Sequence, residues 1–123
     1  MSLRKPPLPS PRALSDDTVL SQYGRLDPKR ATFRNGPRPD RETSQSMFIG
    51  ACDVDQITRK VLGRPGQASD QVRHTTVGRL RAAGFVVTST PGLRNPDHVS
   101  VAVPGNRVPW DHGEQERFDS CFE

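Results

Sequence analysis

The sequence has little cysteine, few aromatic residues and no long apolar run. Its 123 residues include two cysteines, one tryptophan, one tyrosine and five phenylalanines. No apolar stretch approaches the roughly 20 residues that a membrane-spanning helix needs, so we expect no membrane association. The N-terminal region lacks the apolar core of a secretory signal, which predicts a cytoplasmic protein with reduced thiols.

The two cysteines, Cys52 and Cys121, lie far apart in the sequence. A disulfide between them is one alternative, and the one that we favour is two small residues of the core. Together with His74, His98 and His112 they show none of the paired spacings that zinc sites use. No glycine-rich segment has the lysine and the glycine spacing of a phosphate-binding loop. We therefore expect no metal and no cofactor.

Positive charge exceeds negative charge, with 18 lysines and arginines against 14 aspartates and glutamates and a net charge of +4. The excess is spread thinly up to Trp110 and reverses after it, where one arginine is set against five acidic residues. A DNA-binding protein usually concentrates its positive charge on one face. The distribution therefore favours a protein partner, with nucleic acid as the alternative.

The N-terminal segment is rich in proline and in basic residues. Proline removes amide donors and favours extended chain, so we expect a disordered basic tail over 1–17. The rest, 18–123, is predicted to form one small α+β domain with a polar loop at about 34–46. A core of this size gains stability from a partner or from self-association, which leaves a homo-oligomer open.

Two segments joined by a polar turn predict a β-hairpin. Residues 85–90 are of types that favour extended chain, and in 98–103 valine occupies every second position. Proline, glycine and asparagine in the segment between them are typical of a turn. A further buried strand is expected at Met47-Phe48-Ile49, and Thr18-Val19-Leu20 is either one helical turn or a short edge strand.

Two short helices are marked by capping boxes. At 54–62 the helix follows Asp53, with Gln56 three residues later, and its apolar residues include Ile57, Val61 and Leu62. The other, at about 112–122, follows Asp111, with Glu114 at the same spacing. Phe118, Cys121 and Phe122 then recur at helical intervals, and we expect this stripe in the core rather than on a docking surface.

A third helix is predicted at about 70–83. Ser69 or Asp70 is its candidate cap, and the alternative is a helix that begins only at Thr75 or Thr76. Gly78 inside this segment lowers its helix propensity by about 1 kcal/mol. The predicted fold class is therefore a small sheet with the hairpin at 85–90 and 98–103, packed by three short helices.

The segment 75–85, Thr-Thr-Val-Gly-Arg-Leu-Arg-Ala-Ala-Gly-Phe, resembles the end of a winged-helix recognition segment. The resemblance implies DNA binding, with a helix at 69–83 in the groove and the hairpin as the wing. Its arginines, and Arg94 at the tip of the wing, would then contact phosphates or guanine edges. A long turn before the helix and Gly78 within it depart from that pattern, so DNA binding is kept as an alternative.

His98-Val99-Ser100-Val101 is similar to half of the signature of the two-histidine phosphoesterases. In those enzymes paired imidazoles on two strands act as general acid and base, which implies a catalytic role for His98. The matching half would be His74-Thr75-Thr76-Val77, which we expect to be helical and turned away from His98. A histidine-dependent phosphoesterase is the second alternative, and we favour a protein without enzymatic activity.

A broader resemblance covers most of the chain. Leu26-Asp27-Pro28, Ser46-Met47-Phe48, the segment 53–58 and Asn95-Pro96-Asp97-His98 together resemble small bacterial proteins of about this length that carry no assigned activity. The resemblance implies a non-enzymatic accessory protein, one half of a two-gene system. We therefore predict a protein-binding module whose partner presents an acidic surface for pairing with arginine. The expected contact residues are Arg73, Arg79, Arg81, Arg94, Asn95 and His98.

Overall fold

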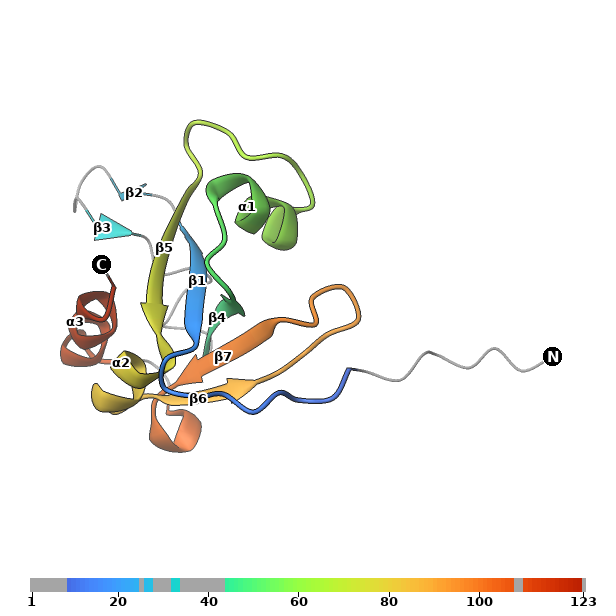
Figure 1. The fold of residues 1–123 in the computed structure, drawn as a ribbon. Helices are drawn as coiled ribbons and strands as arrows, with labels where there is room; N and C mark the ends of the chain where they lie inside the picture. Colours follow the sequence, from blue (N-terminus) through green and yellow to red (C-terminus); the bar gives the residue numbers. More distant parts are fainter. Residues whose placement is uncertain (1–8, 25, 28–31, 34–43, 108–109, 123) are drawn as a thin grey trace.

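The computed structural model of the chain describes residues 9–24, 26–27, 32–33, 44–107 and 110–122. Its elements, shown in Figure 1, are β1 (Val19–Gly24), β2 (Leu26–Asp27), β3 (Thr32–Phe33), β4 (Ser44–Ile49), α1 (Val54–Leu62), β5 (Gln71–Thr76), α2 (Val77–Ala82), β6 (Val86–Ser89), β7 (His98–Ala102), a 3-10 turn η1 (Pro104–Asn106) and α3 (His112–Ser120).

Five of the strands form one antiparallel sheet in the order β5-β1-β4-β7-β6, while β2 pairs with β3 in a separate ribbon. β1 pairs with β5 along its whole length, from Val19 opposite Thr76 to Gly24 opposite Gln71. β7 pairs with β4 on one side and with β6 on the other. The fold is therefore mixed α+β, as the sequence predicts, and β6 and β7 confirm the predicted hairpin.

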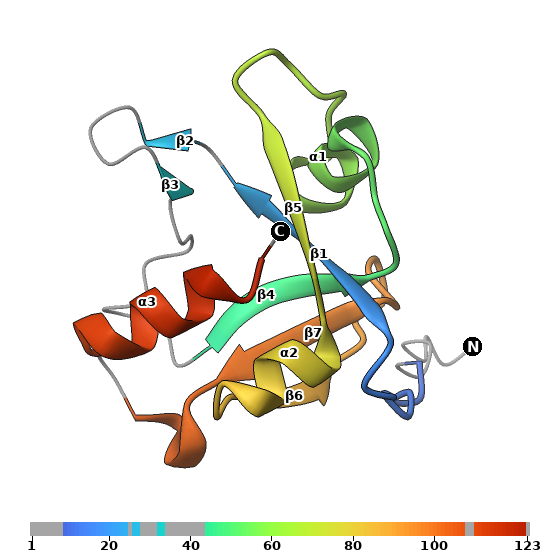
Figure 2. The ribbon, with the colours of Figure 1, turned by 60° about the vertical axis from the view of Figure 1, so that its left-hand side comes forward.

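The two faces of the sheet carry separate cores, because side chains alternate along each strand. On one face the larger core includes Leu20, Met47 and Val101 and packs against α2 and α3. On the opposite face Phe48 and Ile57 belong to a smaller core beneath α1. Figure 2 shows α1 and α3 on opposite sides of the β5 and β1 strands.

Both predicted capping boxes are present. The Asp53 carboxylate accepts from the Gln56 amide at 2.7 Å, and the Gln56 side chain accepts from the Asp53 amide at 2.9 Å. Asp111 and Glu114 make the same pair of contacts at the start of α3. α1 ends at Gly63, whose φ of 68° is one that glycine adopts at no steric cost. These local contacts set both helices where the sequence places them.

The helix predicted at 70–83 is instead a strand followed by a shorter helix. Residues 71–76 form β5, and the Thr76 hydroxyl then accepts from the Arg79 amide to begin α2. The alternative start at Thr76 is therefore the correct one. Asp70 caps no helix, because its carboxylate accepts from the Tyr23 hydroxyl and pairs with Arg64, each at 2.7 Å. Pairing with β1 along the whole segment satisfies the backbone groups on that side of the strand.

The N-terminal segment runs along the folded part from Pro9 onward, while 1–8 of the predicted tail lie outside the described residues. Leu14 packs against the larger core, and the Arg12 amide donates to Ser89 Oγ at 2.9 Å. β1, predicted as a turn or an edge strand, is an interior strand of the sheet. The predicted polar loop is described only for its last three residues, which begin β4.

The second half of the chain supplies most of the larger core, as predicted. Phe85, Trp110 and Phe118 form a cluster in which ring centroids lie 5.2–5.6 Å apart. Both cysteines are buried and free, Cys52 in the smaller core and Cys121 in the larger one. Because they belong to cores on opposite faces of the sheet, they are not paired.

Candidate binding surface

The loop between β6 and β7 brings three of the six predicted contact residues together. The amides of Gly92 and His98 both donate to the Asn95 carbonyl, at 3.0 and 3.2 Å. The Thr90 amide donates to the His98 carbonyl at 3.0 Å and extends the hairpin by one step. These bonds order the turn, so that Arg94 and Asn95 lie at its tip and His98 begins β7.

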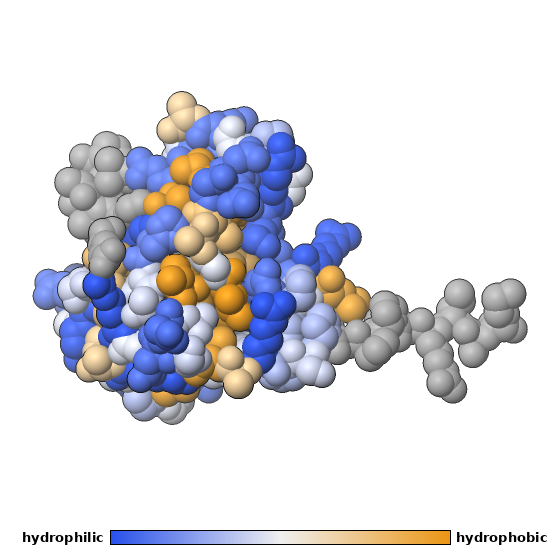
Figure 3. All heavy atoms as spheres, viewed as in Figure 1, coloured by the Kyte–Doolittle hydropathy of each residue, from blue (hydrophilic) through white to orange (hydrophobic). Residues whose placement is uncertain are grey.

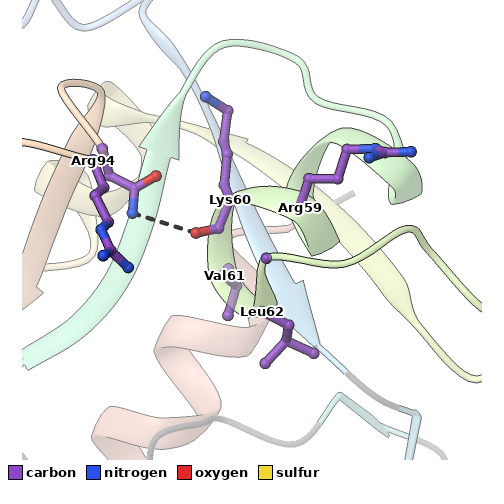
Figure 4. A pocket seen from close by; sticks show the side chains of 7 residues that line it. Arg59, Lys60, Val61, Leu62 and Arg94 are labelled. Carbon is purple, nitrogen blue, oxygen red and sulfur yellow. Dashed lines mark hydrogen bonds between the residues drawn. The ribbon is translucent and has the colours of Figure 1, made fainter.

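The end of α1 meets this loop through Lys60. The Asn95 side-chain amide donates to the Lys60 carbonyl at 3.3 Å, as Figure 4 shows. Carbonyls in the last turn of a helix have no partner within it, so this contact satisfies one of them. Lys60 Nζ lies 3.5 Å from one oxygen of Asp97, and the Arg12 guanidinium lies 2.8 Å from the other. Asp97 therefore ties α1 and the N-terminal segment to the loop.

Two shallow hollows meet at Arg94 and Asn95. The first, of about 490 Å³, lies between the loop and the last turn of α1. The second, of about 460 Å³, is lined by residues of the loop and by His98 at the start of β7. Figure 4 shows the Arg59 guanidinium pointing away from Arg94. We define the Arg94 surface as Lys60, Val61, Leu62, Leu93, Arg94 and Asn95.

The Arg94 surface exposes large apolar side chains. Val61, Leu62 and Leu93 are 41%, 47% and 54% exposed, although the sequence pattern places the first two on the buried side of α1. Ile57 is the residue of that pattern that the smaller core takes up completely. Figure 3 shows a small apolar spot at the β6–β7 loop, next to hydrophilic side chains. Exposed apolar side chains grouped beside a cation are typical of a docking surface.

The positive charge of Arg94, unlike that of Lys60, is not neutralised within the described part of the fold. Most described carboxylates are paired with a cation, namely Asp16 with Arg81, Asp55 with Arg59, Asp70 with Arg64, Asp97 with Arg12 and Lys60, Glu114 with Arg107, and Asp119 with Arg73. In contrast, the Arg94 guanidinium makes no ion pair or hydrogen bond with a described residue. Arg94 is therefore an exposed cation of this surface that no described carboxylate neutralises.

Arg73 corrects one expectation, because it lies inside the fold and not on a contact surface. Its residue is 6% exposed, and its guanidinium donates to Gln22 at 2.8 Å and to Asp119 at 2.9 Å. The Phe122 ring covers it, with the guanidinium carbon 3.8 Å from the ring centroid. Burial lowers the pKa of Arg73, and the Asp119 carboxylate partly offsets that effect. Arg73 joins β5 to α3.

Arg79 and Arg81 lie on α2, apart from the Arg94 surface. Both are exposed, and Arg81 contacts Asp16 at 2.9 Å and the Leu14 carbonyl at 3.2 Å. Figure 1 shows α2 at one end of the β6–β7 hairpin and the loop of Arg94 at the other. The six predicted residues therefore do not form one continuous surface.

The two histidines of the phosphoesterase resemblance are not paired. His74 lies on β5, and not on the predicted helix, with Nε2 2.7 Å from the Cys52 carbonyl. His98 lies on β7, and β1 and β4 separate the two strands. Three strand spacings amount to about 14 Å, which is too far for two imidazoles to act on one phosphate. His98 instead contacts Ser46 and Thr90.

Sequence reasoning missed Lys60, Val61 and Leu62 as parts of the Arg94 surface. It also missed Ser46 as a contact of His98. The apolar pattern of α1 predicts Val61 and Leu62 on the buried face, but the smaller core includes Ile57 and leaves the last turn of the helix exposed. Ser46 precedes His98 by 52 residues, and only the register of β4 with β7 brings them together. No local motif signals that contact.

Within the described residues, no three His, Cys, Asp or Glu side chains are grouped closely enough to hold a metal ion. The helices of this part of the chain are too short and too polar to cross a bilayer.

No protein-family model, no curated protein and no solved structure shows a significant match to the chain.

Proposed function

We propose that this chain is a non-enzymatic, protein-binding accessory module that docks an acidic segment of a partner protein on the Arg94 surface. The observation that carries the proposal is the position of Arg94. Its guanidinium has no partner among the described residues and lies between hollows bordered by exposed Leu93, Val61 and Leu62. A partner carboxylate can form a bidentate pair with such an arginine while neighbouring apolar side chains exclude water.

The shape of the surface favours a protein segment over a small molecule. Small-molecule sites enclose most of their ligand, whereas both hollows are shallow and open to solvent. Arginine is also among the residues enriched at the centres of protein interfaces. Two open hollows separated by one unpaired cation fit a chain that crosses the loop and places side chains on either side of it.

The test compares tagged wild-type protein with Arg94→Glu after expression in the native host. A recurrent partner should be recovered with the wild type and reduced at least about tenfold with Arg94→Glu, as expected for a central interface arginine. Arg117→Glu, on α3, makes the same change of charge at an exposed position outside the Arg94 surface and should retain the partner. Thermal melts of the three proteins establish that each is folded.

Two results would count against this function. One is the absence of any recurrent partner, or equal recovery of a partner by all three proteins. The other is retention on random duplex DNA that weakens steeply with salt and is lost in Arg94→Glu, because this behaviour indicates phosphate binding. In that case the same surface would serve nucleic-acid binding.

A further inference from the structure

The β4, β7 and β6 strands present a row of hydroxyl groups on the face of the sheet that also carries α1. Ser46 on β4 lies opposite Ser100 on β7, and Ser100 lies opposite Thr88 on β6. Thr88 is exposed and the two serines are partly exposed. Residues opposite each other on neighbouring strands have Cβ atoms about 5 Å apart, so one small reactant can contact neighbouring hydroxyls of this row.

His98 lies beside this row, and its ring is fixed from three sides. Nε2 lies 3.0 Å from Ser46 Oγ, and the Phe48 ring packs edge-on against the imidazole with centroids 5.5 Å apart. Nδ1 lies 2.7 Å from Thr90 Oγ1 and 3.2 Å from the Thr90 carbonyl oxygen. A carbonyl oxygen can only accept, so this contact assigns the proton to Nδ1. Nε2 then presents its lone pair to the Ser46 hydroxyl.

The hydrogen bonds continue from His98 through Thr90 to Ser100, which lies on β7 opposite Ser46. Thr90 Oγ1 accepts from His98 Nδ1 and lies 2.8 Å from Ser100 Oγ, a contact in which either hydroxyl can be the donor. When Thr90 is the donor of this pair, the single proton of Ser100 is available to a group outside, on the side of Ser46. A hydroxyl with a base beside it thus lies opposite a hydroxyl that can donate.

We propose that Ser46 is a nucleophile, activated by His98, that accepts an acyl group from an activated carboxylic ester or thioester. Ser46 Oγ bonds to the carbonyl carbon as its proton passes to His98 Nε2, and Ser100 donates to the developing oxyanion. The bond between that carbon and the donor's oxygen or sulfur then breaks. The leaving alcohol or thiol takes the proton from Nε2, and Ser46 retains the acyl group as an ester.

This site goes beyond the binding function and does not depend on it. Acylation of a serine on its own chain, without turnover, requires a nucleophile, a base within hydrogen-bond reach, a group that orients the base and a donor for the oxyanion. Ser46, His98, Thr90 and Ser100 fill these four roles in that order. The expected product is one ester per chain, on Ser46.

Covalent labelling of the full chain with a fluorophosphonate probe, at mildly alkaline pH, tests the proposal. Peptide mass spectrometry should place a single label on Ser46, and p-nitrophenyl acetate should acetylate the same residue. His98→Gln should slow the labelling at least about 100-fold, since general-base catalysis is removed. Ser100→Ala should slow it as well. Ser44→Ala, two residues earlier on β4, is the matched control and should label at the wild-type rate.

An unlabelled Ser46, a label on another hydroxyl, or Ser46 labelling that survives His98→Gln would overturn the proposal. The tautomer of His98 gives a second measurement on the unmodified protein. Its ¹⁵N NMR spectrum should show a protonated Nδ1 and an unprotonated Nε2. The opposite tautomer overturns the proposal whether or not His98→Gln folds, because the lone pair would then face Thr90 and not Ser46.

Discussion

The backbone of Gly78 lies directly against that of Asp16. The Gly78 amide donates to the Asp16 carbonyl at 2.8 Å. A Cβ atom on Gly78 would lie 2.9 Å from the same oxygen, closer than Cβ atoms approach in proteins, and 3.0 Å from Asp16 Cβ, which is tighter than most Cβ contacts. Glycine in α2 therefore has a packing role, since it lets the N-terminal segment reach the helix.

Gly78→Ala is expected to destabilise the fold even though alanine is the better helix former. Alanine gains about 1 kcal/mol of helix propensity, but overpacking against the Asp16 backbone costs about 1–3 kcal/mol. We expect a net loss in the free energy of unfolding and faster proteolysis near Asp16, measured by urea titration and limited digestion.

Gly113→Ala is the matched control for that substitution. Gly113 also lies in a helix, α3, but among the described residues its added Cβ would meet only Asp111 Oδ1, at 3.4 Å. The variant should be neutral or more stable by up to about 1 kcal/mol. If both alanine variants are equally stable, the close approach of Asp16 to Gly78 does not constrain the fold.

β5 shows why part of the fold could not be predicted from the sequence. Capping boxes and the alternating valines are local signals, and they gave α1, α3 and the hairpin. In 71–76 the buried positions are Arg73 and Thr75, so the strand lacks the apolar alternation by which strands are identified. Residues 71–76 form a strand because they pair with β1, and this pairing is a long-range interaction.

The candidate sites were also predictable only where local sequence signals mark them, and not where long-range contacts decide. The polar turn around Arg94 and Asn95 was visible in the sequence as an exposed loop with a cation. Arg73, like Arg94, is an arginine in a polar stretch of the sequence. Its burial, however, depends on Gln22 and Asp119, which lie 51 and 46 residues away. Sequence alone therefore identifies basic residues but does not separate a structural arginine from an accessible one.

Arg73→Ala should lower the free energy of unfolding by about 1.5–3 kcal/mol, because it removes a buried cation that is hydrogen-bonded to the partly exposed Asp119. Asp119 and Gln22 would lose their hydrogen bonds to it, and Phe122 would lose the cation that it covers. A double-mutant cycle with Asp119→Ala, measured by urea titration, should show strong coupling between the two sites.

Arg81→Ala is the matched control for Arg73→Ala. Its ion pair with Asp16 is exposed, with 44% of the arginine side chain and 76% of the aspartate side chain accessible. The expected loss is below about 1 kcal/mol. A comparable loss in the two variants would indicate that the burial of Arg73 adds nothing to stability.

The two thiols should react slowly in the native protein and rapidly after unfolding. Cys52 and Cys121 are both buried, and burial raises the pKa of the Cys121 thiol, which reduces the thiolate that reacts. Titration with a chromogenic disulfide reagent, with and without urea, measures both rates, and Cys52→Ser and Cys121→Ser assign them. Cys121 should be the slower of the two. Immediate reaction of either thiol, or a disulfide between them, would contradict their place in separate cores.

Asp70→Asn should lower the melting temperature by several degrees at neutral pH. The hydrogen bonds from Arg64, Tyr23 and the Gln67 amide hold the pKa of the Asp70 carboxyl well below its usual range. Such a carboxyl stabilises the fold above its unfolded pKa, and that contribution is lost as the pH falls through the folded pKa. The difference between wild type and variant should therefore shrink below about pH 4.

Tyr23→Phe removes one hydrogen bond and should have a smaller effect. A difference in melting temperature that does not vary with pH would show that the Asp70 charge is not what Arg64 and Tyr23 stabilise.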